Sequence, residues 1–476
     1  MYRPDALNRR SGYRYQQLEQ WLWEGIQTQR WRPGERLPSI RALCESTGCS
    51  RATVQHALHR LEARGVLEAR PRSGYFVCLL SGSEPPVHTE PELDTPRPAT
   101  TSDLFRDLMQ RSAAFDLLPE ASSEPLSPGL VGLGRSIARA LRRSTTQLHD
   151  HYDAPAGDLG LRTELARLYA RRGWPARAEA FCITQGCQHA LSLALQACCE
   201  PGDLVAVESP GFYGTLQLLE QLGLKVIEVP SHSRYGLDVE QLAHTLARWP
   251  VKACVFSAAF STPAGGCLPD QARQRLLALA GAHDLALIED DIYAETAFVQ
   301  PPDPLKALDT EDRVILCSSF SKALSRDLRL GWIAGGRWHD RIVQLKLVTQ
   351  LASSRFVQQG VAHFIADGGL ATHLRRQRQQ LRQQRDQLIQ QLRDWPVPVR
   401  MSMPEGGLAL WVELESGQDC LALYQKALAE GIVVTPGPLF STSNGFRHCL
   451  RISFAHPWNE ARRAALRDLS GLCCGG

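Results

Sequence analysis

The first eighty residues place their apolar positions at the spacing of short helices. Tyr15, Leu18, Leu22 and Ile26 recur at intervals of three and four residues, which makes one apolar side of a helix. A Pro-Gly break follows, and Ser39 is then a suitable N-cap for a second helix that ends near a glycine. The pattern therefore predicts two short helices joined by a brief connection.

A third helix is predicted to begin after the N-cap Ser50, and its two sides differ in polarity. Its apolar positions are Val54, Ala57, Leu58 and Leu61. Its outward positions are Arg51, Thr53, Gln55 and His56. Strand-like runs at 66–69 and 75–79 then flank a turn at 71–74, which predicts a hairpin. Short helices followed by a hairpin describe a winged helix-turn-helix, whose third helix enters the major groove of DNA.

From about residue 103 to 472, short apolar runs alternate with helical patterns, which predicts an α/β domain with a mostly parallel sheet. The candidate strands are 181–184, 204–208, 225–229, 253–258, 285–288 and 314–317. Five prolines lie among residues 81–100, and this composition predicts a semi-rigid tether. We therefore expect a DNA-binding domain at 11–80, a linker at 81–102 and a larger domain at 103–472.

Composition and charge narrow the class of protein. Of 476 residues, 43% are hydrophobic and 22% charged, as in ordinary globular proteins. No apolar stretch approaches the roughly 18 residues of a membrane helix, and the N-terminus has no apolar signal segment, so we expect a cytoplasmic protein. The 14 cysteines form no C-x-x-C pair, so we expect no metal site. Residues 1–80 carry thirteen Arg, no Lys and seven acidic residues, and this net charge of +6 suits a polyanionic partner.

The strongest chemical signal follows the apolar run 314–317. Ser319, Lys322 and Arg329 come soon after this run. A lysine amine can form a Schiff base with an aldehyde cofactor, and hydroxyls and a guanidinium suit a phosphate. Because ligands bind outside the carboxyl ends of strands in open α/β sheets, these residues predict a cofactor site.

Two other predicted strands also end in residues that suit such a cofactor. Gly186 follows the run 181–184 and opens a helix, whose N–H groups and dipole favour a phosphate. The acidic residues 289–291 and then Tyr293 follow the run 285–288. One of these carboxylates could keep a pyridine nitrogen protonated, and the tyrosine hydroxyl could bind a ring oxygen. Each signal alone is also typical of an ordinary strand end.

The N-terminal segment resembles the GntR family of regulators over about residues 11–80. The matching motifs are Gly34-Glu-Arg-Leu-Pro-Ser-Ile-Arg41, Ser50-Arg51-Ala-Thr53-Val, Leu61-Glu-Ala-Arg-Gly65 and Arg72-Ser-Gly74. The resemblance implies that the residues contacting DNA include Arg41, Ser50, Arg51, Thr53 and Arg72. It also implies that Gly74 lets the tip of the wing approach the DNA backbone. The alternative is a packing module with no role in DNA binding.

Residues 110–472 resemble fold-type I aminotransferases, in which a lysine carries pyridoxal 5′-phosphate. Besides the Lys322 segment, the matching motifs are His151-Tyr152-Asp-Ala-Pro-Ala-Gly157, Leu161-Arg162, Glu208-Ser-Pro-Gly-Phe212, Pro404-Glu-Gly-Gly407, Pro436-Gly437 and Leu450-Arg451-Ile-Ser453. The resemblance implies that Lys322 forms the Schiff base, while Asp290 pairs with the pyridinium nitrogen and Tyr293 with the ring oxygen. The residues that it implies around the phosphate are Gly186, Cys187, Gln188, Ser319 and Arg329.

The same resemblance assigns three further residues. Phe212 is implied to stack on the cofactor ring, and Arg451 to bind the α-carboxylate of an amino acid, a bidentate task that suits arginine better than lysine. The sequence departs from the family at Thr262-Pro-Ala-Gly265, where relatives have Asn-Pro-x-Gly. Because threonine is shorter than asparagine, we expect one hydrogen bond to the cofactor to be absent or made through water. We expect the cofactor to bind nevertheless and turnover to be weakened.

A winged helix joined to an aminotransferase-like domain is the architecture of the MocR-type subfamily of GntR regulators. The resemblance implies a homodimer that binds double-stranded DNA and whose pyridoxal 5′-phosphate domain senses the cofactor or an amino compound. A second hypothesis is an active aminotransferase with an accessory DNA-binding domain. A third is a regulator whose C-terminal domain is only a dimerisation scaffold. The sequence therefore leaves open whether the protein is also an enzyme, and which effector it binds.

Overall fold

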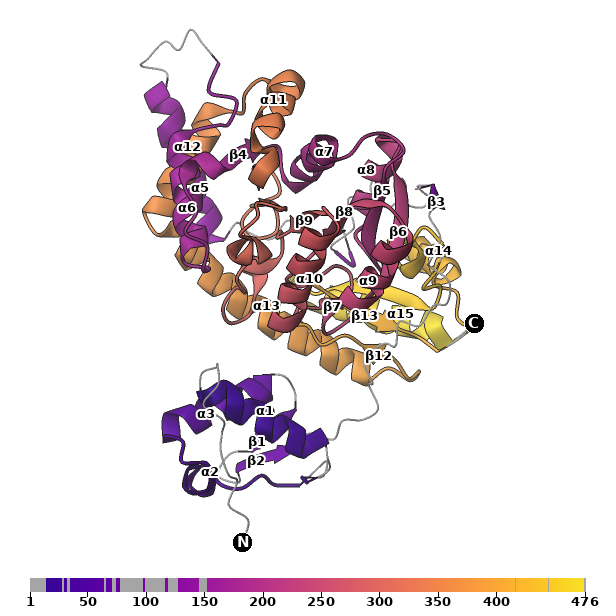
Figure 1. Ribbon diagram of the computed structural model, residues 1–476. Helices are drawn as coiled ribbons and strands as arrows, with labels where there is room; N and C mark the ends of the chain where they lie inside the picture. Colours follow the sequence, from indigo (N-terminus) through magenta and orange to yellow (C-terminus); the bar gives the residue numbers. More distant parts are fainter. Residues whose placement is uncertain are drawn as a thin grey trace. The chain divides into compact units, whose positions relative to one another are not determined.

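Figure 1 shows the computed structural model, in which the chain forms two compact units, Met1–Ser83 and Glu84–Gly476. The residues that the structure describes are 14–27, 30–31, 35–63, 66–70, 74–77, 97–98, 116–118, 127–144, 152–415, 417–443 and 445–474. The expected DNA contact Arg72 and most of the expected linker lie outside these residues. Within the described part of the chain, no helix has the length and apolarity needed to cross a membrane.

The first unit contains the three helices and the hairpin that the sequence predicts. The elements are α1 (Arg14–Gln27), α2 (Ile40–Thr47), α3 (Arg51–Ala63), β1 (Leu67–Arg70) and β2 (Gly74–Val77), and the two strands are antiparallel. Ser39 caps α2 by accepting a hydrogen bond from the Ala42 N–H at 3.2 Å, and Gly48 ends the helix with φ 67°. Ser50 caps α3 in the same way through the Thr53 N–H, also at 3.2 Å. Local capping chemistry thus decides where these helices begin and end.

The core of the first unit is the apolar side of each predicted helix. Leu18 and Leu22 of α1 pack against Val54, Leu58 and Leu61 of α3, and all five side chains are fully buried. Burying a leucine or valine side chain stabilises a fold by about 1.5–3 kcal/mol. Because the apolar side of α3 is buried in this core, its polar side, which includes the exposed Arg51, is the side that can contact a ligand.

The second unit is built on a nine-stranded sheet whose central strands are parallel. Its main strands are β4 (Phe181–Thr184), β5 (Leu204–Ser209), β6 (Lys225–His232), β8 (Val251–Phe256), β9 (Ala286–Asp290), β10 (Val314–Ser319) and β11 (Gly331–Ala334). The order is β3-β6-β5-β8-β9-β10-β11-β4, with β11 antiparallel to both neighbours and β7 (Gly236–Leu237) paired to β6. All six strands predicted from the apolar runs are present, which confirms the α/β fold class. The short strand β3 (Arg97–Pro98), inside the expected linker range, pairs with the edge of β6.

Helices cover both faces of this sheet, as Figure 1 shows. The helices of the second unit are α5 (Pro128–Ser144), α6 (Leu159–Ala170), α7 (Cys187–Cys198), α8 (Tyr213–Gln221), α9 (Val239–Arg248), α10 (Asp270–Ala282), α11 (His339–Gln350), α12 (Arg355–Ala366), α13 (Gly369–Arg393), α14 (Cys420–Ala429) and α15 (Glu460–Cys474). In β5, Val205 and Val207 pack in the cluster with α7, whereas Leu204 and Ala206 pack in the cluster with α9 and α10. Because both faces of the strands are buried, they are continuous apolar runs rather than alternating ones.

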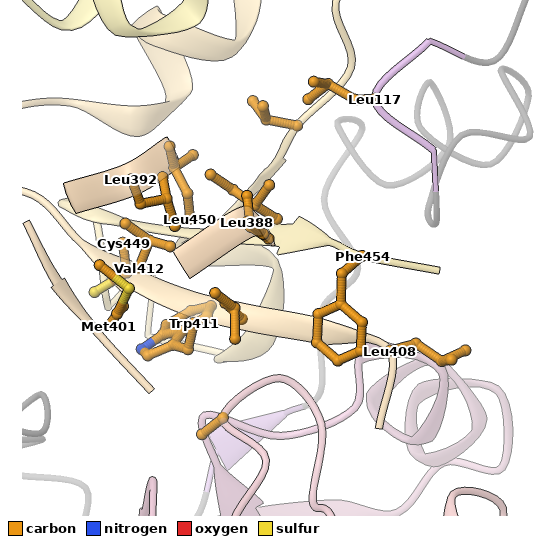
Figure 2. Packing of buried hydrophobic residues seen from close by; sticks show 14 of the residues in the cluster. Leu117, Leu388, Leu392, Met401, Leu408, Trp411, Val412, Cys449, Leu450 and Phe454 are labelled. Carbon is orange, nitrogen blue, oxygen red and sulfur yellow. The ribbon is translucent and has the colours of Figure 1, made fainter. Parts of the chain in front are cut away.

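A smaller antiparallel sheet lies in the C-terminal part of the second unit. Its strands run in the order β12 (Arg400–Met401), β13 (Ala409–Glu413), β15 (Cys449–Ser453) and β14 (Thr435–Pro436). Figure 2 shows its core, where Trp411 of β13 lies among apolar side chains that include Leu450 of β15 and Leu388 of α13. The long helix α13 thus covers this sheet with its C-terminal half.

A buried carboxylate joins the two sheets of the second unit. Glu228, on β6 of the large sheet, is 5% exposed. It accepts hydrogen bonds from the Ser209 hydroxyl at 2.5 Å, the Ser441 hydroxyl at 2.8 Å and the Thr442 hydroxyl at 2.6 Å. Ser441 and Thr442 lie between β14 and β15 of the small sheet. Hydrogen bonds to a buried carboxylate are strong, so Glu228 holds this segment of the small sheet against the large one.

Two glycines of the packed helices α5 and α12 give a test of this fold. A Cβ on Gly360 of α12 would lie 2.6 Å from the Cα of Ile137, whereas nothing lies within 4 Å of a Cβ on Gly134 of α5. We expect Gly360→Ala to destabilise the second unit by about 1–3 kcal/mol through overpacking. Gly134→Ala, the matched control, should stabilise it by up to about 1 kcal/mol. Urea unfolding followed by circular dichroism measures both, and equal midpoints for the two variants would contradict this packing.

Candidate functional site

The carboxyl ends of the parallel strands bring the predicted cofactor residues together. Asp290 is the last residue of β9, and Lys322 follows β10 by three residues. Cys187, the first residue of α7, donates a hydrogen bond from its thiol to Asp290 Oδ1 at 3.3 Å. The Lys322 amine lies 6.0 Å from the centre of the Tyr293 ring. Four residues from three separate segments therefore meet at one edge of the sheet.

Only one of the three consecutive carboxylates at the end of β9 faces this site. Glu289 accepts hydrogen bonds from backbone N–H groups at the start of the short helix η3 (Leu305–Leu308), at 2.7 and 3.1 Å. Asp291 forms a bidentate ion pair with the buried Arg172, at 2.6 and 2.7 Å. Asp290 is left beside Cys187 and Lys322. The tertiary structure thus selects Asp290 as the carboxylate that faces the site.

Burial shifts both ionisable groups at the centre of the site towards their neutral forms. Desolvation raises the pKa of Asp290 to about 6, although hydrogen bonds from Cys187 and the Ile292 N–H oppose the rise. Desolvation also lowers the pKa of Lys322 well below its usual value, and the guanidiniums of Arg326 and Arg451 lower it further. A neutral amine is the nucleophilic form of lysine. The lowered pKa therefore favours the form of Lys322 that can attack an electrophilic carbon.

A second part of the site is suited to a phosphate. Gly186 is the N-cap of α7 with φ 90°, and a Cβ there would lie 2.7 Å from Arg329 Nη2. The same Arg329 nitrogen donates to the Gln185 carbonyl at 2.9 Å. The buried Ser319 ends β10 and pairs with Gly331, where a Cβ would lie 2.6 Å from the Gly186 carbonyl carbon. The backbone N–H groups at a helix N-terminus bind anions, and only glycine allows the guanidinium to approach so closely. The predicted phosphate residues Gly186, Ser319 and Arg329 thus lie around or next to one helix end.

Phe212 and Gln188 lie against the N-terminus of α8. Phe212 is half-buried and directly precedes this helix. Gln188 donates from its side-chain amide to the Gly214 carbonyl at 2.7 Å, and a Cβ on Gly214 would lie 2.6 Å from the Phe212 ring. The close approach of helix and ring therefore depends on Gly214. The side chain of Gln188 holds α8 in place through this contact.

Thr262, the position that departs from the family pattern, contacts Tyr293. The Tyr293 side chain is 5% exposed, and desolvation raises its pKa well above the usual value. Arg451 and a hydrogen bond with the Thr262 side chain both act in the opposite direction. The shorter threonine therefore takes part in the hydrogen bonding of the site through the tyrosine.

Arg451 is a buried guanidinium held between aromatic rings. It lies on β15, is 2% exposed, and donates from Nη2 to the Thr435 hydroxyl at 3.2 Å. Its guanidinium carbon lies 5.3 Å from the centre of the Phe440 ring and 5.8 Å from that of Tyr213. Stacking on aromatic faces fixes the plane of a guanidinium, which favours bidentate binding of a carboxylate.

Several residues of the site do not follow from the sequence motifs. Tyr213 and Phe440 flank Arg451, and no spacing signal connects them to it. Glu208 belongs to a quoted motif, but the motif does not indicate that this carboxyl is buried near Asp290, where desolvation raises its pKa to about 8. Arg326 lies on the loop after Lys322, and both residues line a cavity of about 930 Å³. A polar residue four positions after the lysine was the only available signal for Arg326.

Those expected DNA-contacting residues that the structure describes lie on α2, at the start of α3 and at the start of β2. Arg51 and Ser50 are exposed and Thr53 is half-buried at the start of α3, where the Ser50 and Thr53 hydroxyls lie 2.8 Å apart. Arg41 is exposed on α2 and forms a surface ion pair with Glu45 at 3.0 Å. Gly74 begins β2 with φ 101°, and the side chain of Arg36 lies over it. Arg36, which belongs to the motif beginning at Gly34, is a further cation near β2 that was not among the expected DNA contacts.

Comparison with protein families finds two matches along the chain. Residues 125–468 match the aminotransferase class I and II family, and residues 14–77 match the gntR family of bacterial regulatory proteins. The HTH-type transcriptional regulator YjiR of Escherichia coli is 36% identical, over 96% of this chain and 98% of that protein. The HTH-type transcriptional regulator TauR of Rhodobacter capsulatus is 30% identical, over 89% of this chain and 88% of that protein.

A comparison with solved structures matches the second unit. The α-aminoadipate aminotransferase LysN of Thermus thermophilus, complexed with N-(5′-phosphopyridoxyl)-L-leucine, superposes with a TM-score of 0.70 at 27% identity. The match covers 79% of this chain and 95% of that structure. A kynurenine aminotransferase of Pyrococcus horikoshii gives the same TM-score at 26% identity.

The raised pKa of Asp290 gives a pH-dependent stability test. Folding raises this pKa from 3.8 to about 6, so the folded state is penalised for the ionised carboxylate above pH 6 and not below pH 4. At about 1.4 kcal/mol for each pH unit, we expect Asp290→Asn to stabilise the cofactor-free protein by roughly 2–3 kcal/mol at pH 8. The gain should fade as the pH falls from 6 to 4. Urea unfolding at pH 8 and at pH 4 measures this gain in stability, and the exposed Asp468→Asn is the control. A gain that is the same at both pH values would contradict the raised pKa of Asp290.

Proposed function

The chain belongs to the MocR-type subfamily of GntR regulators, and we propose that an amino compound bound beside Lys322 changes how the protein binds DNA. The protein is a DNA-binding transcriptional regulator with an aminotransferase-like domain, and its cofactor is pyridoxal 5′-phosphate. The observation that carries the proposal is the buried amine of Lys322 beside Asp290, together with Gly186 and Arg329 at the N-terminus of α7, which suit an anion.

The residues of the site fit the cofactor. Gly186 leaves room at the helix end, where Arg329 and the N–H groups of α7 would hold the phosphate. Asp290 would hold the proton of the pyridine nitrogen, and Tyr293 would donate to the ring oxygen. When bound, pyridoxal 5′-phosphate supplies an aldehyde carbon that reacts with primary amines. Lys322 would hold that carbon until another amine competes for it.

Arg451 defines which competing amine the site favours. A buried arginine stacked on Phe440 and Tyr213 binds a carboxylate well, so the proposed effector is an α-amino acid. The effector can act on DNA binding only if it binds two conformations of the protein with different affinity. The segment 440–442 suits this role. Its Ser441 and Thr442 hydroxyls bind Glu228 of the large sheet, and its Phe440 ring lies beside Arg451.

Two further properties belong to the proposal. A homodimer is supported by exposed apolar side chains on three helices of the second unit, namely Val131, Leu141, Leu347, Val348 and Phe356. A cytoplasmic location is supported by the DNA partner, which a bacterial regulator meets there. Turnover of an amino acid with a keto acid is a second candidate function, because Lys322, whose pKa is lowered by burial, Asp290 and Arg451 are all retained.

The visible absorbance of the purified protein tests the cofactor and the effector together. We expect a band from the lysine-bound cofactor that disappears in Lys322→Ala, because no other amine replaces this side chain. Adding α-amino acids should shift the band and change the affinity for operator DNA in the same concentration range. A band that amino acids shift without any effect on DNA binding would favour the second candidate function. A wild-type protein with no band in excess pyridoxal 5′-phosphate would contradict the proposal.

The DNA-binding helix is tested by salt dependence. Removing one cation that binds a DNA phosphate makes the slope of log affinity against log salt shallower by about one. We expect Arg51→Gln to weaken binding to a random-sequence DNA duplex and to reduce the slope by this amount. Arg14→Gln, an exposed arginine at the start of α1, is the matched control and should leave both unchanged. Identical slopes for Arg51→Gln and the wild type would show that Arg51 does not bind a DNA phosphate, and would contradict the assignment of α3 to the DNA interface.

A further inference from the structure

The helix α13 concentrates positive charge in a unit that is acidic as a whole. Its 25 residues include six arginines and a single acidic residue, Asp386. The whole chain carries a net charge of +3 and residues 1–80 carry +6, so the remaining residues carry −3. At a rise of 1.5 Å per residue, α13 is about 37 Å long. A basic helix of this length on an acidic unit calls for an explanation beyond solubility.

Three of these arginines lie in a line along the solvent side of α13. Arg375, Arg382 and Arg393 are seven and eleven residues apart, which is close to two and three turns of a helix. Arg375 and Arg393 are exposed and Arg382 is half-buried, whereas Leu381 and Leu388 on the other side of the helix are buried. We call Arg375, Arg382 and Arg393 the α13 stripe. It extends over about 27 Å of the helix axis.

The other arginines of α13 have places within the second unit. Arg378 forms an ion pair with Glu295 at 2.8 Å, and the buried Arg385 pairs with Asp386 at 2.7 Å. Arg376 lines the cavity of about 930 Å³ described above. The only acidic residue of the helix is therefore already neutralised. Within the described part of the chain, no arginine of the α13 stripe forms an ion pair.

Three exposed arginines on other elements of the second unit do have carboxylate partners. The pairs are Arg275–Glu240 at 3.1 Å, Arg337–Asp284 at 3.0 Å and Arg467–Glu460 at 2.8 Å. Such pairs leave little local excess of positive charge, whereas the α13 stripe does leave one. Gln379 and Gln390 lie between its arginines on the same exposed side, and glutamine side chains also bind phosphate oxygens. The stripe thus suits a polyanion with regularly spaced phosphates.

We propose that the α13 stripe binds the phosphate backbone of double-stranded DNA. The inference goes beyond the proposed function, in which α3 and its neighbours in the first unit contact DNA, and it rests on that DNA binding. A duplex carries one negative charge about every 1.7 Å along its axis, so a row of unpaired guanidiniums complements it. Phosphate contacts position a protein on DNA without reading its sequence. The second unit therefore adds affinity for DNA of any sequence, and the first unit supplies the specificity.

The salt dependence of DNA binding by the full chain tests the stripe. The stripe variant combines Arg375→Gln, Arg382→Gln and Arg393→Gln, because glutamine is a good helix former. Each lost phosphate contact makes the slope of log affinity against log salt shallower by about 0.9. We expect a slope shallower by about two to three for each protomer that contacts DNA. Affinity at about 50 mM salt should fall at least about tenfold, for operator and random-sequence duplexes alike.

A matched control removes the same net charge elsewhere on the second unit. It combines Arg275→Gln, Arg337→Gln and Arg467→Gln, and it should keep the slope of the wild type. The stretch of duplex protected from hydroxyl radicals is the second readout. This stretch should be shorter with the stripe variant than with the wild type or the control.

Several results would overturn the inference. These are a stripe variant with the slope and the protected stretch of the wild type, and a control that loses as much slope, since net charge alone would then explain the effect. Urea unfolding checks that the stripe variant is folded. If it is not, the exposed Arg375→Gln and Arg393→Gln are measured singly, and unchanged slopes for both overturn the inference. A loss in Arg51→Gln without one in the stripe variant leaves the proposed function standing, whereas a wild type that binds no DNA contradicts that function itself.

Discussion

The site depends on keeping water away from the amine of Lys322. Charged groups lose their hydration when they are buried, so desolvation pushes Lys322 and Asp290 towards their neutral forms. This dry edge exists because β9 and β10 are buried on both faces by helices. A lysine on a solvated loop would be an ammonium ion and a poor nucleophile. The covering helices are therefore as necessary to the chemistry as the lysine itself.

The second requirement is that the small sheet reaches over this edge. Arg451 is useful only where its guanidinium faces the amine of Lys322, and it lies on a strand of the other sheet. The carboxylate of Glu228 supports this arrangement, since it binds Ser441 and Thr442 directly after Phe440, whose ring stacks on Arg451. A change in ligand at Arg451 thus has a short path to the contact between the sheets. Such a contact is a reasonable element for a regulator, which must adopt two conformations.

The sequence predicted local features well where neighbouring residues decide them. Ser39 and Ser50 cap their helices as expected, because an N-cap depends on one side chain and an N–H two or three residues away. The six strands of the large sheet were found because buried parallel strands are continuous apolar runs. Strand ends were less accurate; β10, for example, continues through Ser318 and Ser319, since pairing with β11 includes these polar residues.

The sequence by itself determined the family and the fold class, and its motifs predicted Lys322, Asp290 and Arg451 as site residues. Only the tertiary structure showed why Asp290, and neither Glu289 nor Asp291, faces the site. Arg172, more than a hundred residues away, neutralises Asp291. The positions of Arg326 beside Lys322 and of Phe440 beside Arg451 were decided in the same way. Contacts between distant segments depend on how sheets and helices pack, and spacing along one chain does not contain that information.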